Sequence, residues 1–209
     1  MDAVVEAGVR QFAYLSVPEI PYDDRVPGFR VKRLNERRLR ESGLVYTIVR
    51  VSLFMDSWLA LVGSSIPTRG SEAATLNRPY HFLQPFRRAT GQLVENHGIA
   101  LIPGSERTRH SFITIDDVTV FVAACTGNPD AKNRIYEIGG HRGPQLGRGC
   151  RVLRTRSRQE VRAVHTPAAV YAVQQRLLGL VSTAAGNLMG MNRIIATQTP
   201  YMALPRLRD

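Results

Sequence analysis

The chain has 209 residues, of which 44% are hydrophobic and 22% charged, a composition typical of a packed globular protein and not of a disordered or fibrous one. Its net charge of +11 would normally suggest nucleic acid or an anionic membrane as a partner, but seven arginines lie in one Gly/Arg-rich stretch, residues 141–162. We therefore expect no nucleic-acid partner and no membrane partner.

The first residues indicate a helix followed by a buried strand. Residues 2–7 predict the last turns of a helix, which Gly8 can end in the left-handed conformation. Residues 9–17, VRQFAYLSV, predict a strand buried on both faces, as parallel sheets require. A helix that ends at glycine just before a buried strand is typical of an α/β protein.

The next elements continue the same alternation. After a loop rich in proline and aspartate, residues 29–42 predict a basic helix with Val31, Leu34 and Leu39 toward the sheet. Residues 45–51 predict a second buried strand. Residues 52–62 are apolar and predict a returning helix.

The middle of the chain is less regular. Residues 67–91 are polar, and their aromatic side chains suggest a short helix or lid beside a pocket. Short strands are predicted at 99–102 and 111–115, and Asp116 is a candidate N-cap for a helix over residues 117–125.

The last third contains one strand, one irregular stretch and two helices. Residues 134–138 predict a strand, whereas residues 141–162 show neither helical nor strand periodicity. Thr166 and Pro167 form a helix start, a hydroxyl cap followed by proline at the first helical position. Two apolar helices are predicted over 168–180 and 184–195, followed by a loosely held tail.

Four segments carry a resemblance to one family. VRQFAYLSV resembles the fifth strand, and KRLNERRLRESGLVYTIVR the following helix and strand, of atypical short-chain dehydrogenase/reductases, the NmrA-like group of NAD(P)-binding proteins. SFITIDDVTVFVAACTGNP and NRIYEIGG also resemble that group. The resemblance covers most of residues 3–140 and, more loosely, 164–200. It implies a partial Rossmann-like parallel sheet, its later strands, with a small C-terminal α/β substrate-binding portion.

The resemblance assigns a role to Lys32. Lys32 and Glu36 match a K-x-x-x-E pattern in which the lysine binds the nicotinamide ribose and lowers the pKa of a tyrosine four residues earlier. Gly28 stands at the tyrosine position here, and Tyr22 is a speculative substitute. Lys32 is therefore the candidate catalytic residue. For Glu36, an ordinary surface pair with Lys32 and a role at the site are both open.

Strand ends supply the other candidate site residues. In open α/β sheets, ligands bind beyond the carboxyl ends of the strands. The candidate cofactor contacts are therefore Leu15, Ser16 and Val17 after the first strand, and Val51, Ser52 and Leu53 after the second. Phe54 and Met55 are candidates for lining a substrate pocket, although apolar residues beside a strand are also typical of core.

The phosphate-binding part of such a site is absent from the sequence. Dinucleotide binding in this fold depends on a first strand followed by G-x-G-x-x-G, and no such motif occurs in the chain. We expect the cofactor, NAD or NADP, to bind weakly or not at all. We interpret residues 1–66 as the C-terminal half of the NAD(P)-binding domain and 67–209 as the substrate side.

A related hypothesis is that the sequence is an incomplete version of a longer protein, with a local frame change over 141–162. A truncated sheet exposes a strand edge, which predicts self-association. Cys125, Cys150 and the five histidines lack the spacing of a zinc or redox site, so no metal is predicted. MDAVVEAG lacks the basic start of a secretion signal, and residues 51–66 are too short to span a membrane, so we expect a cytoplasmic protein.

Three functions follow, of which the third, a basic nucleic-acid-binding module, is favoured only by the net charge. The first is an oxidoreductase that moves hydride between the nicotinamide cofactor and a small carbonyl, enone or hydroxyl substrate, impaired in this form. The second is a non-catalytic nucleotide sensor or scaffold of the same fold, favoured by Gly28 in place of tyrosine.

Overall fold

The structure is a computed structural model that describes residues 2–20, 25–55, 58–59, 62–65, 88, 90–105, 108, 110–140 and 160–197. These residues form two compact units. The first unit contains the described residues of 2–52 and 111–140, and the second those of 53–110 and 160–197. After passing through the second unit, the chain returns to the first unit to add a third strand. Tyr22, the expected lid and most of the Arg-rich stretch lie outside the described residues.

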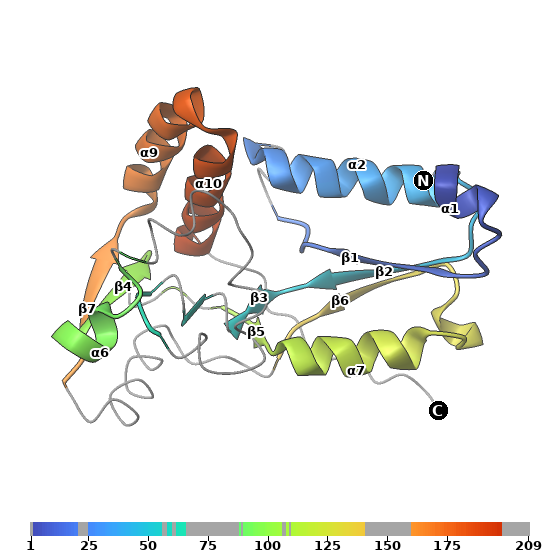
Figure 1. Cartoon of the computed structure of the whole chain (residues 1–209), viewed down its shortest axis with the longest axis horizontal. Coiled ribbons are helices and arrows are strands. Elements are labelled where there is room, and N and C mark those ends of the chain that lie inside the picture. The colour runs from blue at the N-terminus through green and yellow to red at the C-terminus, as the bar shows by residue number, and fades with distance from the viewer. Residues whose placement is uncertain are drawn as a thin grey trace. The chain divides into compact units, whose positions relative to one another are not determined.

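The first unit is built on a parallel sheet. Strands β1 (Phe12–Ser16), β2 (Tyr46–Val51) and β6 (Arg134–Ile138) pair in the order β1-β2-β6. Both pairings are parallel. Helix α2 (Pro27–Glu41) lies on one face of this sheet and α7 (Ile115–Cys125) on the other, as Figure 1 shows. The predicted α/β class with a Rossmann-like parallel sheet is confirmed.

Strand β1 differs from its expected environment. The short helix α1 (Asp2–Glu6) precedes it, and Gly8 ends that helix with a φ of +63°, as predicted. Among the described strands β1 pairs only with β2, so its other edge is open. Ala13 and Leu15 are exposed and Ser16 is buried. The prediction of burial on both faces is therefore wrong for β1.

Helix α2 is rotated relative to its predicted orientation. Leu39 is fully buried against the sheet, but Val31 and Leu34 are exposed. The sheet-facing position is taken by Glu36, which is buried and pairs with Arg50 on β2. The expectation that all three apolar residues face the sheet is wrong for Val31 and Leu34, because an ion pair sets the rotation of the helix.

Helix α7 begins earlier than predicted. The Oγ1 atom of Thr114 accepts a hydrogen bond of 3.0 Å from the amide of Asp117, so Thr114 is the N-cap in place of Asp116. Asp116 and Asp117 instead lie in the first turn, where a carboxylate stabilises the positive end of the helix dipole. Strand β5 (Phe112–Ile113) precedes α7, and the 3-10 turn η3 (Pro129–Ala131) follows it.

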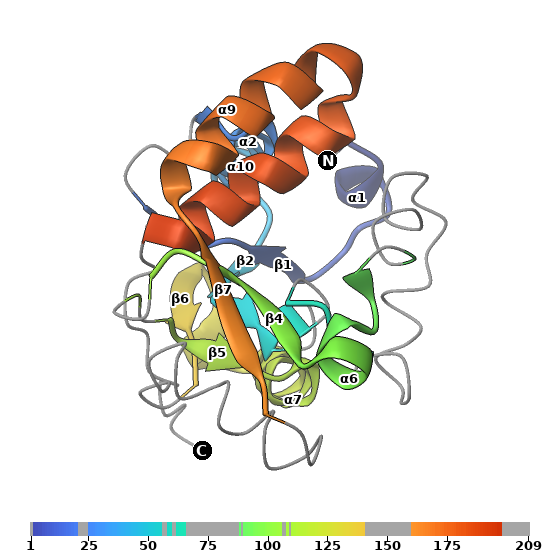
Figure 2. The ribbon, with the colours of Figure 1, turned by 90° about the vertical axis from the view of Figure 1, so that its left-hand side faces the viewer.

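The second unit contains a two-stranded sheet and a helical hairpin. Strand β4 (Ile99–Pro103) pairs in parallel with β7 (Arg162–Thr166), which the sequence did not predict because β7 begins inside the Arg-rich stretch. Figure 2 shows these two strands side by side. The remaining described elements are the short strand β3 (Leu53–Phe54), where a helix was expected to begin, and the helix α6 (Leu93–His97).

Helices α9 (Ala168–Val181) and α10 (Thr183–Thr197) form the hairpin, as predicted, and pack against each other (Figure 2). They approach closely at two glycines: a Cβ atom on Gly186 would lie 2.8 Å from the Cα atom of Gly179. The expected cap is not observed, since Pro167 holds the N-cap position and Thr166 interacts with Tyr171. None of the helices described here is long and apolar enough to cross a membrane.

Candidate functional site

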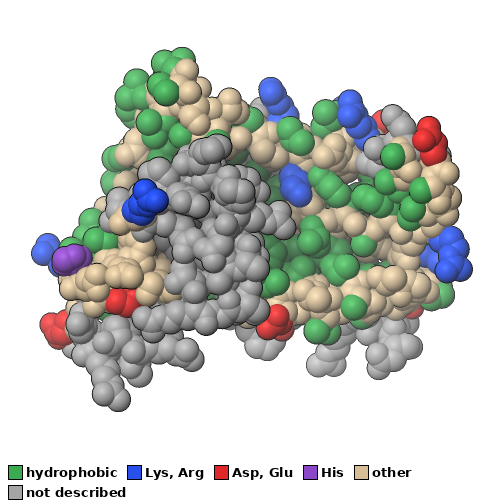
Figure 3. Space-filling view, in the orientation of Figure 1, with side chains coloured by type: hydrophobic (Ala, Val, Ile, Leu, Met, Phe, Trp, Pro, Cys, Tyr) green, Lys and Arg blue, Asp and Glu red, His purple; other side chains and the backbone are tan. Residues whose placement is uncertain are grey.

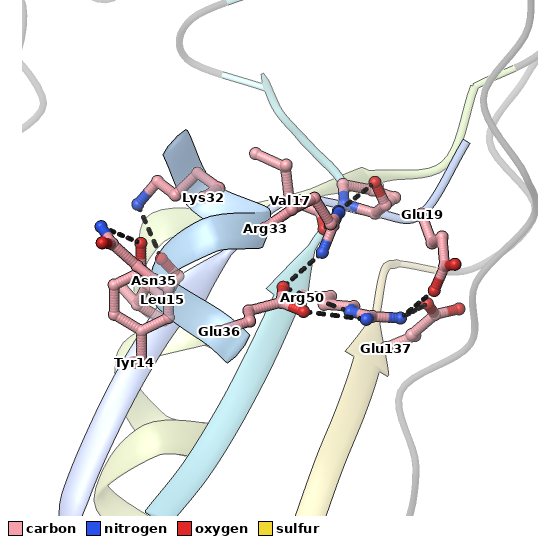
Figure 4. Close-up of polar contacts among 11 residues, drawn as sticks. Tyr14, Leu15, Val17, Glu19, Lys32, Arg33, Asn35, Glu36, Arg50 and Glu137 are labelled. Carbon is pink, nitrogen blue, oxygen red and sulfur yellow. Dashed lines mark hydrogen bonds and ion pairs between the residues drawn. The ribbon is translucent and has the colours of Figure 1, made fainter. Parts of the chain in front are cut away.

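The candidate site lies at the carboxyl ends of β1 and β2 in the first unit. Because the two strands are parallel and Ser16 stands opposite Arg50, their carboxyl ends meet at one edge of the sheet. Helix α2 covers one face of the sheet, and its N-terminal half brings Lys32 beside the end of β1 (Figure 4). The strand-end site, as used below, comprises Leu15, Ser16, Val17, Lys32, Val51 and Ser52.

Lys32 is held against the end of β1. Its Nζ atom donates a hydrogen bond of 2.7 Å to the carbonyl oxygen of Leu15 and lies 4.9 Å from the centre of the Tyr14 ring. Desolvation lowers the pKa of Lys32 below its usual value, and the negative charge of Glu36 partly opposes this shift. The ammonium group is therefore fixed at the strand end, where a ribose hydroxyl could replace the carbonyl as acceptor.

Tyr14 is a partner of Lys32 that the sequence analysis missed. The hydroxyl of Tyr14 accepts a hydrogen bond of 3.2 Å from the Nδ2 atom of Asn35, one turn after Lys32 on the same helix. Tyr14 lies two residues before Ser16, so both side chains point to the face of β1 that α2 covers. Because alternate residues of a strand point to the same face, the position of Ser16 in the sequence was enough to place Tyr14 on the face toward α2.

Arg33 fastens the loop after β1 to α2. Its guanidinium donates to the carbonyl oxygens of Val17 and Pro18, the second at 2.7 Å, and pairs with Glu36. The chain that leaves the strand-end site is thus held by a side chain on the same helix that presents Lys32. Val17 therefore contributes its backbone to this contact.

Arg50, the penultimate residue of β2, is the centre of an ion-pair network. Its guanidinium lies 2.8 Å from Glu36, 2.8 Å from Glu19 and 3.0 Å from Glu137, as Figure 4 shows. Burial would lower the pKa of Arg50, but the hydrogen bonds to Glu36 and Glu137 reverse this and raise it. The three carboxylates come from α2, from the loop after β1 and from β6, so the network joins every element around the strand ends.

Glu36 is a buried structural anion, so of the two interpretations left open for it the surface pair with Lys32 is excluded. Burial would raise the pKa of the Glu36 carboxyl, but the hydrogen bond from Arg50 and the charges of Arg33 and Arg50 bring it below its usual value. Its two oxygens contact these two arginines, and Lys32 interacts with it only through its charge. Glu36 therefore sets the position of α2, and so that of Lys32.

The two serines of the strand-end site are both buried. Ser16 contributes to the low pKa of Glu36 through its hydroxyl. The backbone amide of Ser52 donates a hydrogen bond of 2.9 Å to Ile138, whereas the Ser52 hydroxyl has no hydrogen-bond partner among the described residues. A buried hydroxyl without a partner is costly unless a ligand or water completes it. The Ser16 hydroxyl likewise has no hydrogen bond to a described residue, so both serines can take a further contact.

Three predicted site residues fall in the second unit. Leu53, Phe54 and Met55 are assigned to it by their contacts, and Met55 is exposed. The strand-end site therefore consists of residues of the first unit alone. Gly28 lies in the first turn of α2, so the position where the resemblance implies a tyrosine carries no side chain.

No protein-family model matches the sequence, and no curated protein matches it either. Similar folds occur among solved structures, and those named here have low sequence identity to this chain. A nucleoside-diphosphate-sugar epimerase from Staphylococcus aureus is 18% identical with a TM-score of 0.61, and the match covers 95% of this chain and 61% of that one. An NADPH-dependent quinone oxidoreductase from Escherichia coli is 20% identical with a TM-score of 0.60, over 92% and 58% of the two chains.

A third similar structure is a triphenylmethane reductase from Citrobacter sp. complexed with NADP(H), 13% identical with a TM-score of 0.61, over 93% of this chain and 58% of that chain. The present chain thus spans about 60% of the length of these structures. Identities at this level establish the fold. The chain therefore has the Rossmann-like fold of the epimerase and the two reductases that it resembles in structure.

Proposed function

We propose that the first unit binds the nicotinamide end of NAD or NADP at the strand-end site, as in an NmrA-like atypical short-chain dehydrogenase/reductase. The observation that carries the proposal is the position of Lys32, whose ammonium lies at the carboxyl end of β1 within 2.7 Å of a backbone carbonyl. The similar structures support it, because two of those named above are described as NADPH-dependent or as NADP(H) complexes.

The residues at the strand ends suit this half of the cofactor. A nicotinamide ribose presents hydroxyl groups that need both donors and acceptors. Lys32 supplies a charged donor, and the buried Ser52 hydroxyl can donate or accept. Val51 ends β2 and brings its backbone to the same edge. When bound, the reduced cofactor would supply a hydride to a small carbonyl or enone substrate, or the oxidised cofactor would accept one from a hydroxyl substrate, while Lys32 orients the ribose.

The same reasoning leads us to propose weak binding. The sequence has no G-x-G-x-x-G loop to hold the pyrophosphate at a helix N-terminus. One of the three N–H donors of Lys32 is also occupied by the Leu15 carbonyl, which leaves two for a ribose. Both effects reduce affinity, so a dissociation constant in the high micromolar to millimolar range is expected.

The test is a titration of the purified chain with NADPH, followed by nicotinamide fluorescence. The chain contains two lysines, Lys32 and Lys132, so a matched pair of variants is available. Lys32→Met should weaken binding at least tenfold, whereas Lys132→Met, at an exposed position after η3, should leave it unchanged. Equal binding by both variants, or no fluorescence change at millimolar NADPH, would exclude the strand-end site.

A second function, a non-catalytic nucleotide sensor or scaffold, is favoured by Gly28. A reductase of the type that the chain resembles needs a proton donor near the lysine, and Gly28 offers none. Tyr14 lies beside Lys32, and its hydroxyl accepts a hydrogen bond from Asn35, a contact that does not use the hydroxyl's own proton. NADPH binding without oxidation across a panel of aldehydes, ketones and quinones would favour this function.

The open edge of β1 supports a separate proposal, self-association through strand pairing. Leu15 and Ala13 are exposed there, and among the described strands only β2 pairs with β1. An unpaired edge presents free backbone donors and acceptors to another chain. A Leu15→Lys substitution should weaken such association, and analytical ultracentrifugation measures it.

A further inference from the structure

Helix α9 in the second unit carries an apolar stripe that faces outward. The stripe consists of five exposed residues, Val170, Val173, Leu177, Leu180 and Val181. Leu177 is 61% exposed, Leu180 85% and Val181 88%. Figure 3 shows hydrophobic side chains gathered over this hairpin, at the upper left.

The stripe lies opposite the face of α9 that packs on α10. Tyr171 and Gly179 mark the packed face: Tyr171 is buried, and Gly179 contacts Gly186 of α10. At 100° per residue, four of the stripe residues lie within about 40° of the direction opposite these two, and Val181 lies about 60° from it. Helix α9 is therefore apolar on both sides, and a helix apolar all round is normally buried.

The chemistry of the stripe indicates a protein partner. The 14 residues of α9 are fewer than the roughly 20 that cross a bilayer. A helix that lies on an anionic membrane carries several basic residues on its polar face, and α9 has one charged residue, Arg176. A large exposed apolar patch with few charges is typical of a protein interface.

The spacing of the stripe is that of a coiled coil. Val170, Val173, Leu177 and Leu180 follow one another at intervals of three, four and three residues, which is the alternation of a and d positions in a heptad. These four residues, called the seam below, span about 15 Å along the helix. The intervals also read the same in both directions, so the seam is symmetric about Gln175.

That symmetry makes the seam complementary to itself. In an antiparallel pair of α9 helices centred on Gln175, Val170 lies opposite Leu180 of the second copy, and Val173 lies opposite Leu177. The single charge, Arg176, then faces Gln174 of the second copy, so no like charges meet. Every apolar residue of the seam thus meets an apolar residue across a two-fold axis.

We propose that α9 is the interface of a homodimer in which the α9 helices of two copies pack antiparallel. The interface is isologous, and each α9 is supported from behind by α10 through the close contact of Gly179 and Gly186. The two hairpins together form a four-helix arrangement that buries the stripe. This interface is distinct from the β1 edge and does not depend on cofactor binding.

The first test is sedimentation of the full chain over a range of concentrations. The wild-type chain should show a monomer–dimer equilibrium, and Leu177→Glu should weaken it at least tenfold by placing a charge at the seam. The matched control is Val120→Glu on α7, an exposed apolar residue of the first unit at 70% exposure, which should leave the equilibrium unchanged. Circular dichroism should show that both variants keep the wild-type helix content.

The second test fixes the orientation. In a Cys150→Ser background, with Cys125 buried, separate Val173→Cys and Leu177→Cys proteins are prepared and oxidised alone or mixed. An antiparallel seam gives disulfide-linked dimers mainly in the mixture. A parallel seam gives them in each protein alone, and that result would overturn the proposal.

Other outcomes also contradict it. A chain that stays monomeric at high concentration, or a dimer that Leu177→Glu leaves intact, excludes α9 as the interface. A dimer lost on Leu15→Lys but not on Leu177→Glu assigns association to the β1 edge. Sedimentation of the wild-type chain with phosphatidylserine vesicles, lost in Leu177→Glu, would show that a membrane and not a second copy covers the stripe.

Discussion

The two units of this chain bury ionisable groups in opposite states. In the first unit, Glu36 is buried and stays charged, because Arg33 and Arg50 hold its pKa below the usual value. In the second unit, His110 is buried and stays neutral, because desolvation lowers its pKa to about 4, against a weaker opposing hydrogen bond to the backbone of Ile195.

The difference shows what each buried group does for its unit. A charged pair has directional contacts, so the network of Glu36 and Arg50 fixes the rotation of α2 on the sheet and the place of Lys32. A neutral buried histidine is tolerated as a packed polar ring. The first arrangement positions a site, and the second makes its unit sensitive to acid.

The largest effect is expected from breaking the network at its centre. Arg50→Met leaves Glu36 buried with Arg33 as its remaining cation, and should lower the free energy of unfolding by about 3 kcal/mol or more. Urea denaturation measures this. Arg134→Met, at an exposed arginine of the neighbouring strand β6, is the control and should change stability little. A double variant, Glu36→Met with Arg50→Met, should regain much of the loss, since no buried charge is left unpaired.

The next largest effect is a loss of stability at different pH in the two units. The folded state disfavours protonated His110, so its contribution to stability is complete above pH 6.5, the usual pKa, and is lost as pH falls toward 4. The loss should reach about 3 kcal/mol, at about 1.4 kcal/mol per pKa unit. The contribution of Glu36, whose pKa is depressed, is present above about pH 4.5 and lost only below it.

Urea denaturation at pH 7 and pH 5 tests this separation. Wild type should lose stability between the two values, and His110→Gln should lose much less, because glutamine does not titrate. Glu36→Gln should keep the wild-type loss, since Glu36 remains ionised throughout this range. An identical loss in wild type and His110→Gln would contradict the assignment of the acid sensitivity to His110.

Most secondary structure could be predicted because it depends on local patterns. Gly8 ends α1 and the periodicities gave β2, β4, β6, α9 and α10 close to their observed bounds. The errors arise where a tertiary contact overrides the pattern. Val31 and Leu34 were expected to face the sheet, but a buried glutamate takes that direction. Strand β7 was hidden because its first residue, Arg162, belongs to a charged stretch.

The candidate site could be predicted in part for the same reason. Lys32, Ser16 and Ser52 follow from strand ends and from the resemblance, and the first unit brings these elements to one edge. The network around Arg50 could not be predicted, because Glu137 is 87 residues away along the chain and is its partner only through strand pairing.

The smallest effect concerns the exposed members of the same network. Glu19 and Glu137 also pair with Arg50, but their side chains are largely exposed, so water and ions screen both pairs. Glu19→Gln and Glu137→Gln should each lower the free energy of unfolding by about 0.5 kcal/mol, and this loss should vanish in 1 M NaCl. Urea denaturation at low and high salt measures both values. Either variant could instead lose nearly as much free energy of unfolding as Arg50→Met. Burial would then not be what distinguishes Glu36 from the other two carboxylates. The contrast between the two units would in that case have a cause other than desolvation.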